Sequence, residues 1–169
     1  MDRGSTPVAN RLVALIGVIN QECVVLEHLV FKLHEAELLG AAGNLRFMGM
    51  MSDEIDDAAS QLGSTEITRA LLTADLTHQL GIDGDATLAE IAGAAPQEVS
   101  STLLEARRRL VVLTDAVERY ANEAEAAVSE RLDHVAATAA GMEDPAVSGH
   151  DPYRKTRSAA APASFQQRV

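Results

Sequence analysis

The chain of 169 residues is 47% apolar and 3% aromatic, contains no Trp, and carries a formal net charge of −11. This length fits one domain, and a core with few aromatic side chains favours helices packed on helices over a sheet. The first 140 residues hold 22 acidic and 10 basic side chains, so we expect no binding to nucleic acid and no insertion into a membrane. A need for solubility alone would also explain this charge.

The single cysteine, Cys23, excludes a disulfide within the chain and fits a reducing compartment. The apolar stretch 12–19 lacks the small-residue cleavage site of a secretory signal, and it is far shorter than the roughly 20 residues that a spanning helix needs. The sequence therefore predicts a cytoplasmic protein without a targeting segment.

A long helix is predicted over residues 8–39, after a flexible N-terminus of residues 1–7. Its main apolar seam advances in steps of four and three, the heptad spacing of bundles and coiled coils. This seam consists of Leu12, Ile16, Ile19, Cys23, Leu26, Val30 and Leu33. A second row contains Leu15, Val18, Val25 and Leu29, and a third contains Val24, Phe31 and Leu38. Gly40 or Gly43 can end the helix in the left-handed conformation.

A second long helix is predicted over residues 44–80, with Asn44 as its cap. Its seam contains Met48, Met51, Ile55, Ala58 and Leu62. Gly63 and Ser64 interrupt the spacing, so we expect a kink or a short break there. Beyond it the seam resumes with Ile67, Leu71, Leu72, Leu76 and Leu80. The methionines Met48, Met50 and Met51 fit core filling better than an adaptable binding surface.

A short helix opens with a capping box, Thr87-Leu-Ala-Glu90, and closes near Pro96. The last long helix, residues 97–139, carries the seam Leu103, Ala106, Leu110, Leu113, Val117, Tyr120, Ala124 and Ala127, which Leu132 and Val135 extend after a phase slip. Residues 141–169 have no sustained period and predict a disordered tail. The fold class is therefore all-α: an elongated antiparallel bundle of three long helices and one short helix over residues 8–140.

No pattern of catalytic or metal-binding residues stands out, so we expect neither an enzyme nor a cofactor. Among the five histidines, Asp75 with His78 is the nearest approach to a metal-ligand pair. Cys23 lies in the helical seam, where a small buried hydrophobe is its common role. The basic run of Arg107, Arg108 and Arg109 fits a solvated face paired with residues such as Glu105, or a contact for an acidic partner.

The first helix offers more apolar surface than a three-helix bundle obviously covers. Two neighbours cover two of its three rows, and an uncovered row marks an interaction site. A second copy of the chain or an amphipathic helix of another protein would fit it. We expect the binding residues to be Val25, Leu29, Phe31 and Leu33 of the first helix with Leu110, Leu113, Val117 and Tyr120 of the last.

Several segments resemble the FlgN-type flagellar export chaperones, particularly their actinobacterial branch. They are Leu29-Val-Phe-Lys-Leu-His-Glu-Ala-Glu-Leu-Leu-Gly-Ala-Ala-Gly43, Asp53-Glu-Ile-Asp56, Ala70-Leu-Leu, Ala86-Thr-Leu-Ala-Glu-Ile-Ala-Gly-Ala-Ala-Pro96 and Leu103-Leu-Glu-Ala-Arg107. The similarity covers roughly residues 10–135. These motifs are mostly Leu, Ala and Glu, and their order and spacing agree with the family. Thr65 and Arg69 interrupt the apolar phase of the second helix, so we expect the groove there to differ from the family pattern.

The resemblance implies a cytoplasmic chaperone that binds the terminal amphipathic helices of hook-associated proteins of the FlgK and FlgL type. Such a chaperone prevents the aggregation of these clients and delivers them to the type III export gate. The family's tail contacts the gate, which points to Tyr153, the only tyrosine of the tail. The alternative hypothesis is a structural coiled-coil protein that associates with further copies of itself as a homo-oligomer.

Overall fold

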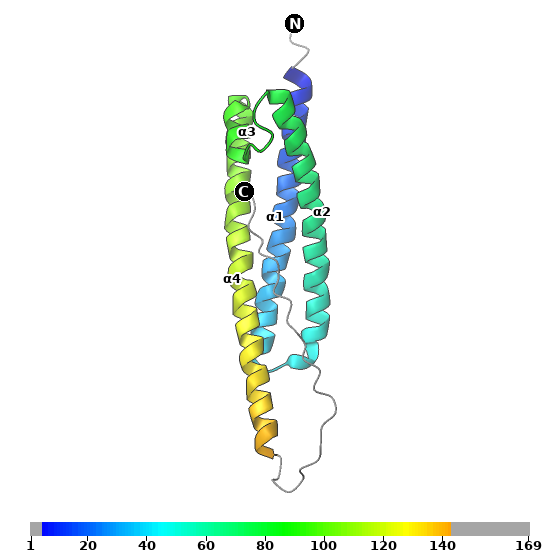
Figure 1. Cartoon of the computed structure of the whole chain (residues 1–169), viewed down its shortest axis with the longest axis vertical. Coiled ribbons are helices and arrows are strands. Elements are labelled where there is room, and N and C mark those ends of the chain that lie inside the picture. The colour runs from blue at the N-terminus through cyan, green and yellow to red at the C-terminus, as the bar shows by residue number, and fades with distance from the viewer. Residues whose placement is uncertain (1–4, 143–169) are drawn as a thin grey trace.

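The structure, a computed structural model, describes residues 5–142 and builds them into an elongated bundle (Figure 1). Its elements are α1 (Ser5–Ala41), a 3-10 turn η1 (Leu45–Phe47), α2 (Met48–Leu80), α3 (Leu88–Ala94) and α4 (Gln97–Met142), with no strand in this range. The all-α prediction of three long helices and one short helix is confirmed. The tail beyond residue 142, including Tyr153, lies outside the described residues.

Helix α1 is the centre of the bundle, because it packs extensively against both α2 and α4 while these two make almost no close contact with each other. The chain runs along α1, returns along α2, and runs parallel to α1 again along α4 (Figure 1). Helix α3 packs mainly on α4, at the end where α1 begins (Figure 1). A helix with neighbours on two sides needs a wide apolar face, and this explains why the first and second rows of α1 are both apolar.

The core follows the predicted seams of α1 and α4. Leu12, Leu15, Ile19 and Leu26 of α1 are buried together with Leu103 and Leu110 of α4, and Leu88 and Ile91 of α3 close the same cluster. Cys23 is also fully buried, as its place in the seam predicts. Burial raises the pKa of its thiol, which keeps it in the protonated, unreactive form.

Helix α2 differs from its prediction in the residues that face the core. Of the two alternatives predicted at Gly63, the structure excludes the break, because the helix continues through this residue. The inward side of the helix then carries Thr65 and Arg69 where the apolar phase was expected to resume. Ile67 and Leu71, which the sequence assigned to the seam, are exposed instead. The heptad spacing from Met51 runs through positions 65 and 69, so the polar residues lie inward and the apolar pair lies outward.

Arg69 lies inward because it has a buried partner. Its Nε donates a hydrogen bond to Oε2 of Glu22 over 2.8 Å, and Glu22 is only 2% exposed at the centre of α1. Desolvation raises the pKa of the Glu22 carboxyl, an effect that outweighs the attraction of Arg69, and the nearby Glu66 adds to it. The sequence predicted an apolar core here, and the structure contains an ion pair between α1 and α2.

The turns follow the glycine and capping signals, with one correction. Gly43 and Gly81 have φ values of 72° and 68°, in the left-handed region that favours glycine. The capping box of α3 is confirmed, since the Glu90 amide donates to Thr87 Oγ1 and the Thr87 amide donates to the Glu90 carboxylate over 2.7 Å. Asn44, predicted to cap the second helix, makes no side-chain cap; it precedes η1, and α2 begins only at Met48.

Helix α1 is, from Val8 to Ala41, long and apolar enough to cross a membrane by length and composition alone. The expectation based on residues 12–19 missed this, because the apolar stretch is only part of a 34-residue segment. The core helix of a bundle passes the same test, and in this fold α1 is packed between α2 and α4. Its composition therefore does not by itself indicate a spanning segment.

Candidate helix-binding surface

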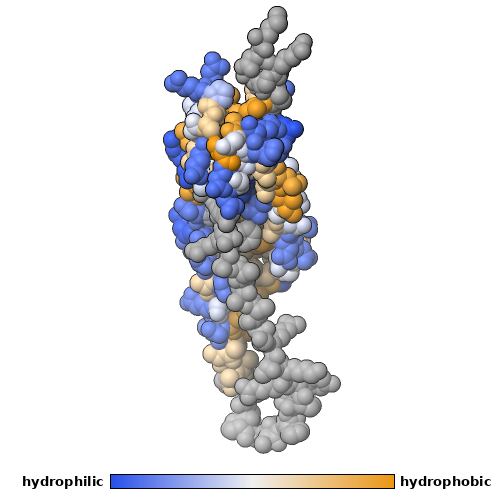
Figure 2. Space-filling view, turned by 45° about the horizontal axis from the view of Figure 1, so that its top comes forward, coloured by the Kyte–Doolittle hydropathy of each residue, from blue (hydrophilic) through white to orange (hydrophobic). Residues whose placement is uncertain are grey.

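The outward side of α1 carries a row of large apolar side chains that none of the other helices within residues 5–142 covers. Val24, Phe31 and Leu38 are 53%, 55% and 55% exposed, and we call them the outer row. They are seven residues apart, so they share one heptad position and lie opposite the buried seam. Figure 2 shows one face of the molecule, on which orange apolar patches interrupt a largely blue surface. A row of large exposed apolar side chains is the kind of feature that marks an interaction surface.

The row is joined to α4 by an ion pair. Arg109 of α4 donates from Nη2 to Oε1 of Glu27 over 2.7 Å. Val24 and Phe31 lie three residues before and four residues after Glu27, so both neighbour it on the helix surface. Val112 lies three residues after Arg109 and is 61% exposed. Exposed apolar side chains of both helices therefore lie within one turn of this exposed ion pair, and they widen the row into a patch.

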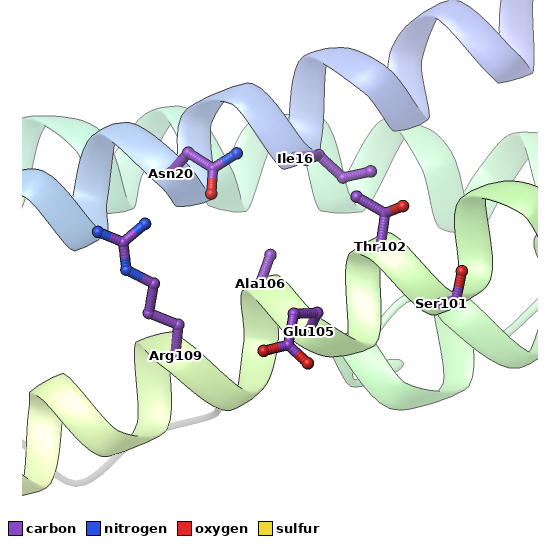
Figure 3. A pocket seen from close by; sticks show the side chains of 7 residues that line it. All are labelled: Ile16, Asn20, Ser101, Thr102, Glu105, Ala106 and Arg109. Atoms are coloured by element: carbon purple, nitrogen blue, oxygen red, sulfur yellow. The ribbon is translucent and has the colours of Figure 1, made fainter.

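A shallow groove between α1 and α4 continues the patch toward the start of α1 (Figure 3). Ile16 and Asn20 of α1 face it from one side, and its volume is about 390 Å³. Ser101, Thr102, Glu105, Ala106 and Arg109 of α4 line the other side. The groove is open to solvent and is lined by the apolar side chains of Ile16 and Ala106 together with polar side chains of both helices.

Ring contacts lie beside the row, at the level of α1 between Phe31 and Leu38. The rings of His34 and Tyr120 meet edge to face, with centroids 5.2 Å apart, and Arg119 lies over the Tyr120 ring. His34 also bonds Glu37 over 3.0 Å. The Lys32 ammonium lies 5.4 Å from the centroid of the Phe31 ring. It also forms ion pairs with the carboxylates of Glu54 and Glu35, and these two bonds raise the pKa of Lys32. These contacts hold the side chains around Phe31 in place, and Phe31 itself stays exposed.

Most of the predicted binding residues belong to the core instead of an open surface. Val25, Leu29 and Leu33 of α1 are at most 8% exposed, and Leu110 of α4 is 1% exposed. The expectation that Val25 and Leu29 belong to an uncovered row is wrong, because α1 has helices on two sides and both its first and second rows are buried. Of the predicted residues on α1, only Phe31 is exposed.

The predicted residues of α4 other than Leu110 take an intermediate position. Leu113, Val117 and Tyr120 are half-buried and pack against the core cluster. They support the contact between α1 and α4 and are partly exposed to solvent. Tyr153 lies outside the described residues.

Sequence reasoning missed three members of this surface. Val24 and Leu38 were recognised as a third row of the helix but were not chosen as binding residues, although their shared seven-residue spacing with Phe31 was the available signal. Val112 gave no such signal, since it lies outside the seam of α4, and its link to the row is its position one turn after Arg109, which pairs with Glu27.

Arginines of the basic run form ion pairs, and two of the three methionines pack in the core. Arg108 pairs with Glu105 on its own helix, and Arg109 pairs with Glu27 across helices. Met51 is buried and Met48 packs beside it in a second small core cluster, whereas Met50 is exposed. Within residues 5–142, no three His, Cys, Asp or Glu side chains come together as a metal site would require.

Comparison with known proteins identifies no relative of this chain. No family model, no curated protein and no solved structure matches the chain. The all-α bundle and its exposed patch are therefore the basis on which a function has to be argued.

Proposed function

We propose that this protein is a cytoplasmic helix-binding chaperone of the FlgN type. In this proposal it holds the terminal amphipathic helices of hook-associated proteins and presents them to the type III export gate. The observation that carries the proposal is the outer row of α1: three large apolar side chains at one heptad position, uncovered within the described bundle. Spacing of this kind is what an amphipathic client helix, with its own apolar stripe, would match.

Two further features support binding over catalysis. The groove between α1 and α4 extends the outer row with polar groups, including Asn20 and Arg109, which could hold the polar edge of a docked helix. The resemblance of the sequence to FlgN-type chaperones implies the same kind of client. The described helices are strongly acidic, which would favour a client helix with basic flanks and speed its association.

The test is binding of peptides from the terminal helices of hook-associated proteins, measured by calorimetry or fluorescence anisotropy. Phe31→Asp places a charge at the centre of the patch and should weaken binding by about tenfold or more, because the charge would have to be desolvated under the client helix. Far-UV circular dichroism should stay unchanged, since Phe31 makes no core contact.

Ile67→Asp is the matched control. Ile67 is exposed on α2, more so than Phe31, and lies outside both the outer row and the groove. We expect this variant to bind the peptide as the parent does. Equal binding by the parent and Phe31→Asp, or equal loss in both variants, would contradict the placement of the client on α1. No binding of any terminal-helix peptide by the parent would sink the chaperone proposal itself.

A structural coiled-coil protein is the second candidate, because the outer row could equally cover the same row of a second copy. The like charge of two acidic chains opposes this pairing along the body of the bundle. A tight homodimer that loses its partner in Phe31→Asp and ignores every client peptide would favour this candidate.

A further inference from the structure

Exposed apolar side chains lie on both α1 and α2 at the end of the bundle where these two helices are connected. Ala36 of α1 packs with Met51 of α2 in the second small core cluster, so the two segments lie at the same level of the bundle. Their near neighbours, Leu38 of the outer row and Met50 of α2, are both more than half exposed. Apolar surface is therefore open on both helices at this end.

Met50 begins a stripe on α2 that is otherwise acidic. Four residues with the spacing i, i+3, i+4 and i+7 share one face of this helix: Met50, Asp53, Glu54 and Asp57. Glu54 pairs with Lys32, whose ammonium lies beside the Phe31 ring, so this face of α2 borders the outer row. Within residues 5–142, neither Asp53 nor Asp57 takes part in an ion pair, and both are exposed. We call this surface, which consists of Leu38, Met50, Asp53 and Asp57, the corner surface.

The tail of the same chain carries a pattern that complements the corner surface. Residues 152–169 contain four basic residues and no acidic one, although the whole chain has a formal net charge of −11. Three of these bases, Arg154, Lys155 and Arg157, follow Tyr153 within four residues. An aromatic side chain followed by bases is the counterpart of an apolar surface followed by acids. We call residues 153–157 the basic segment.

The basic segment begins within reach of the corner surface. Helix α4 ends at Met142, beyond the connection between α1 and α2 (Figure 1). From Val128, which lies against Gly40, to Met142 the helix extends about 21 Å at roughly 1.5 Å per residue. The ten residues 143–152 span up to about 33 Å when extended. They are therefore long enough to return along α4 and to cross to the face of α2.

We propose that the basic segment docks on the corner surface of its own chain. The Tyr153 ring covers Leu38 and Met50, and the bases that follow it pair with Asp53 and Asp57. The lengths agree, because the five residues of the segment span about 13 Å when extended and the acidic stripe rises about 10 Å along α2. The order agrees as well: a segment that comes from the end of α4 and runs along α2 meets the apolar side chains first and the carboxylates afterwards.

The covalent connection favours this occupant over a separate molecule. A linker of ten residues holds the segment near the surface at an effective concentration on the order of millimolar. The corner surface offers two apolar side chains and two exposed carboxylates, and contacts of this size are weak between separate molecules. A second copy of the chain would also bring its own acidic body against the same carboxylates.

Disulfide cross-linking of the full chain tests the docking. Ser158 directly follows the basic segment, and Gln61 follows Asp57 by one turn on the same face of α2. Ser158→Cys with Gln61→Cys should form its intramolecular disulfide at least about fivefold faster than the matched control, Ser158→Cys with Ala59→Cys. Ala59 is exposed as Gln61 is, but it lies roughly 200° around the helix. Cys23 does not interfere, because it is fully buried. Equal rates in the two proteins would overturn the proposal.

Charge reversal tests whether the carboxylates hold the segment. Asp53→Lys with Asp57→Lys should lower the rate of cross-linking at Gln61 to that of the Ala59 control, because like charges then face each other. Changing the three bases of the segment to Glu in the same protein should restore the preference, since the two charges are opposite again. A preference that survives the first reversal, or that does not return after the second, overturns the pairing.

The docked segment also regulates the outer row, a consequence that rests on the proposed function. A client helix has to displace the segment from Leu38, so changing the three bases to Glu should raise the affinity for a terminal-helix peptide by about threefold. Unchanged affinity would contradict this regulation. Preferential cross-linking in a protein that binds no peptide would contradict only the chaperone proposal. Peptide binding together with equal cross-linking at both positions would contradict only the docking.

Discussion

The inner and outer faces of α1 are both apolar, but only the inner face is buried. The inner face, with residues such as Ile19 and Leu26, is buried between α2 and α4, whereas the outer row of Val24, Phe31 and Leu38 remains open. Both faces repeat every seven residues on the same helix, so hydrophobicity alone does not tell core from contact surface. The difference teaches that a helix in the middle of a three-helix arrangement has a third side that the other described helices do not cover.

The largest expected effect comes from Leu29→Asp, on the inner face. Leu29 is 5% exposed, so the substitution buries an unpaired carboxylate in the core. We expect a loss of more than about 4 kcal/mol in the free energy of unfolding, enough to abolish the cooperative transition of a marginal bundle. Chemical denaturation followed by circular dichroism measures this. A folded, stable Leu29→Asp protein would place Leu29 on an open surface, as the sequence suggested.

Arg69→Leu is expected to be nearly as damaging, although it makes the inner face more apolar. It leaves Glu22 buried without its partner, which costs about 3–5 kcal/mol. The double variant Glu22→Leu with Arg69→Leu should recover most of this loss, because it removes both charges. If the double variant is as unstable as the single one, the ion pair has a role in packing that replacement by leucine does not satisfy.

The Glu22 carboxyl also predicts a dependence of stability on pH. Its pKa in the folded bundle is raised above the ordinary value of 4.5, so the folded state holds this proton more tightly than the unfolded chain does. The resulting stabilisation is complete below pH 4.5 and is lost as the pH rises through the folded pKa. Comparing unfolding of the parent and Glu22→Gln across this range isolates the contribution. Parallel pH profiles in the two proteins would show that Glu22 is not its source.

The smallest effect is expected on the outer face. Phe31→Ser and Val24→Ser should change the free energy of unfolding by about 0.5 kcal/mol or less, since both side chains are more than half exposed and lie outside the core clusters. Thermal unfolding at low protein concentration gives this comparison with Leu29→Asp directly. A loss of several kcal/mol at either position would mean that the outer row is packed, and the contrast between the two faces of α1 would disappear.

The sequence by itself determined the helices of this protein, because spacing and end signals are local properties. The heptad seams of α1 and α4, the capping box at Thr87 and Glu90, and the glycine turn at Gly81 all follow from neighbours within one or two turns. The all-α class followed in the same way from a composition without the residues that sheets favour.

The tertiary structure decided which apolar rows are covered and which polar residues lie inward. Val25 and Phe31 are both apolar and six residues apart, and only the positions of α2 and α4 around α1 make one core and the other surface. The inward turn of Arg69 depends on Glu22, which is 47 residues away in the chain and invisible to any local pattern. Burial and ion pairing arise between distant segments, and their outcome is set only when the helices pack.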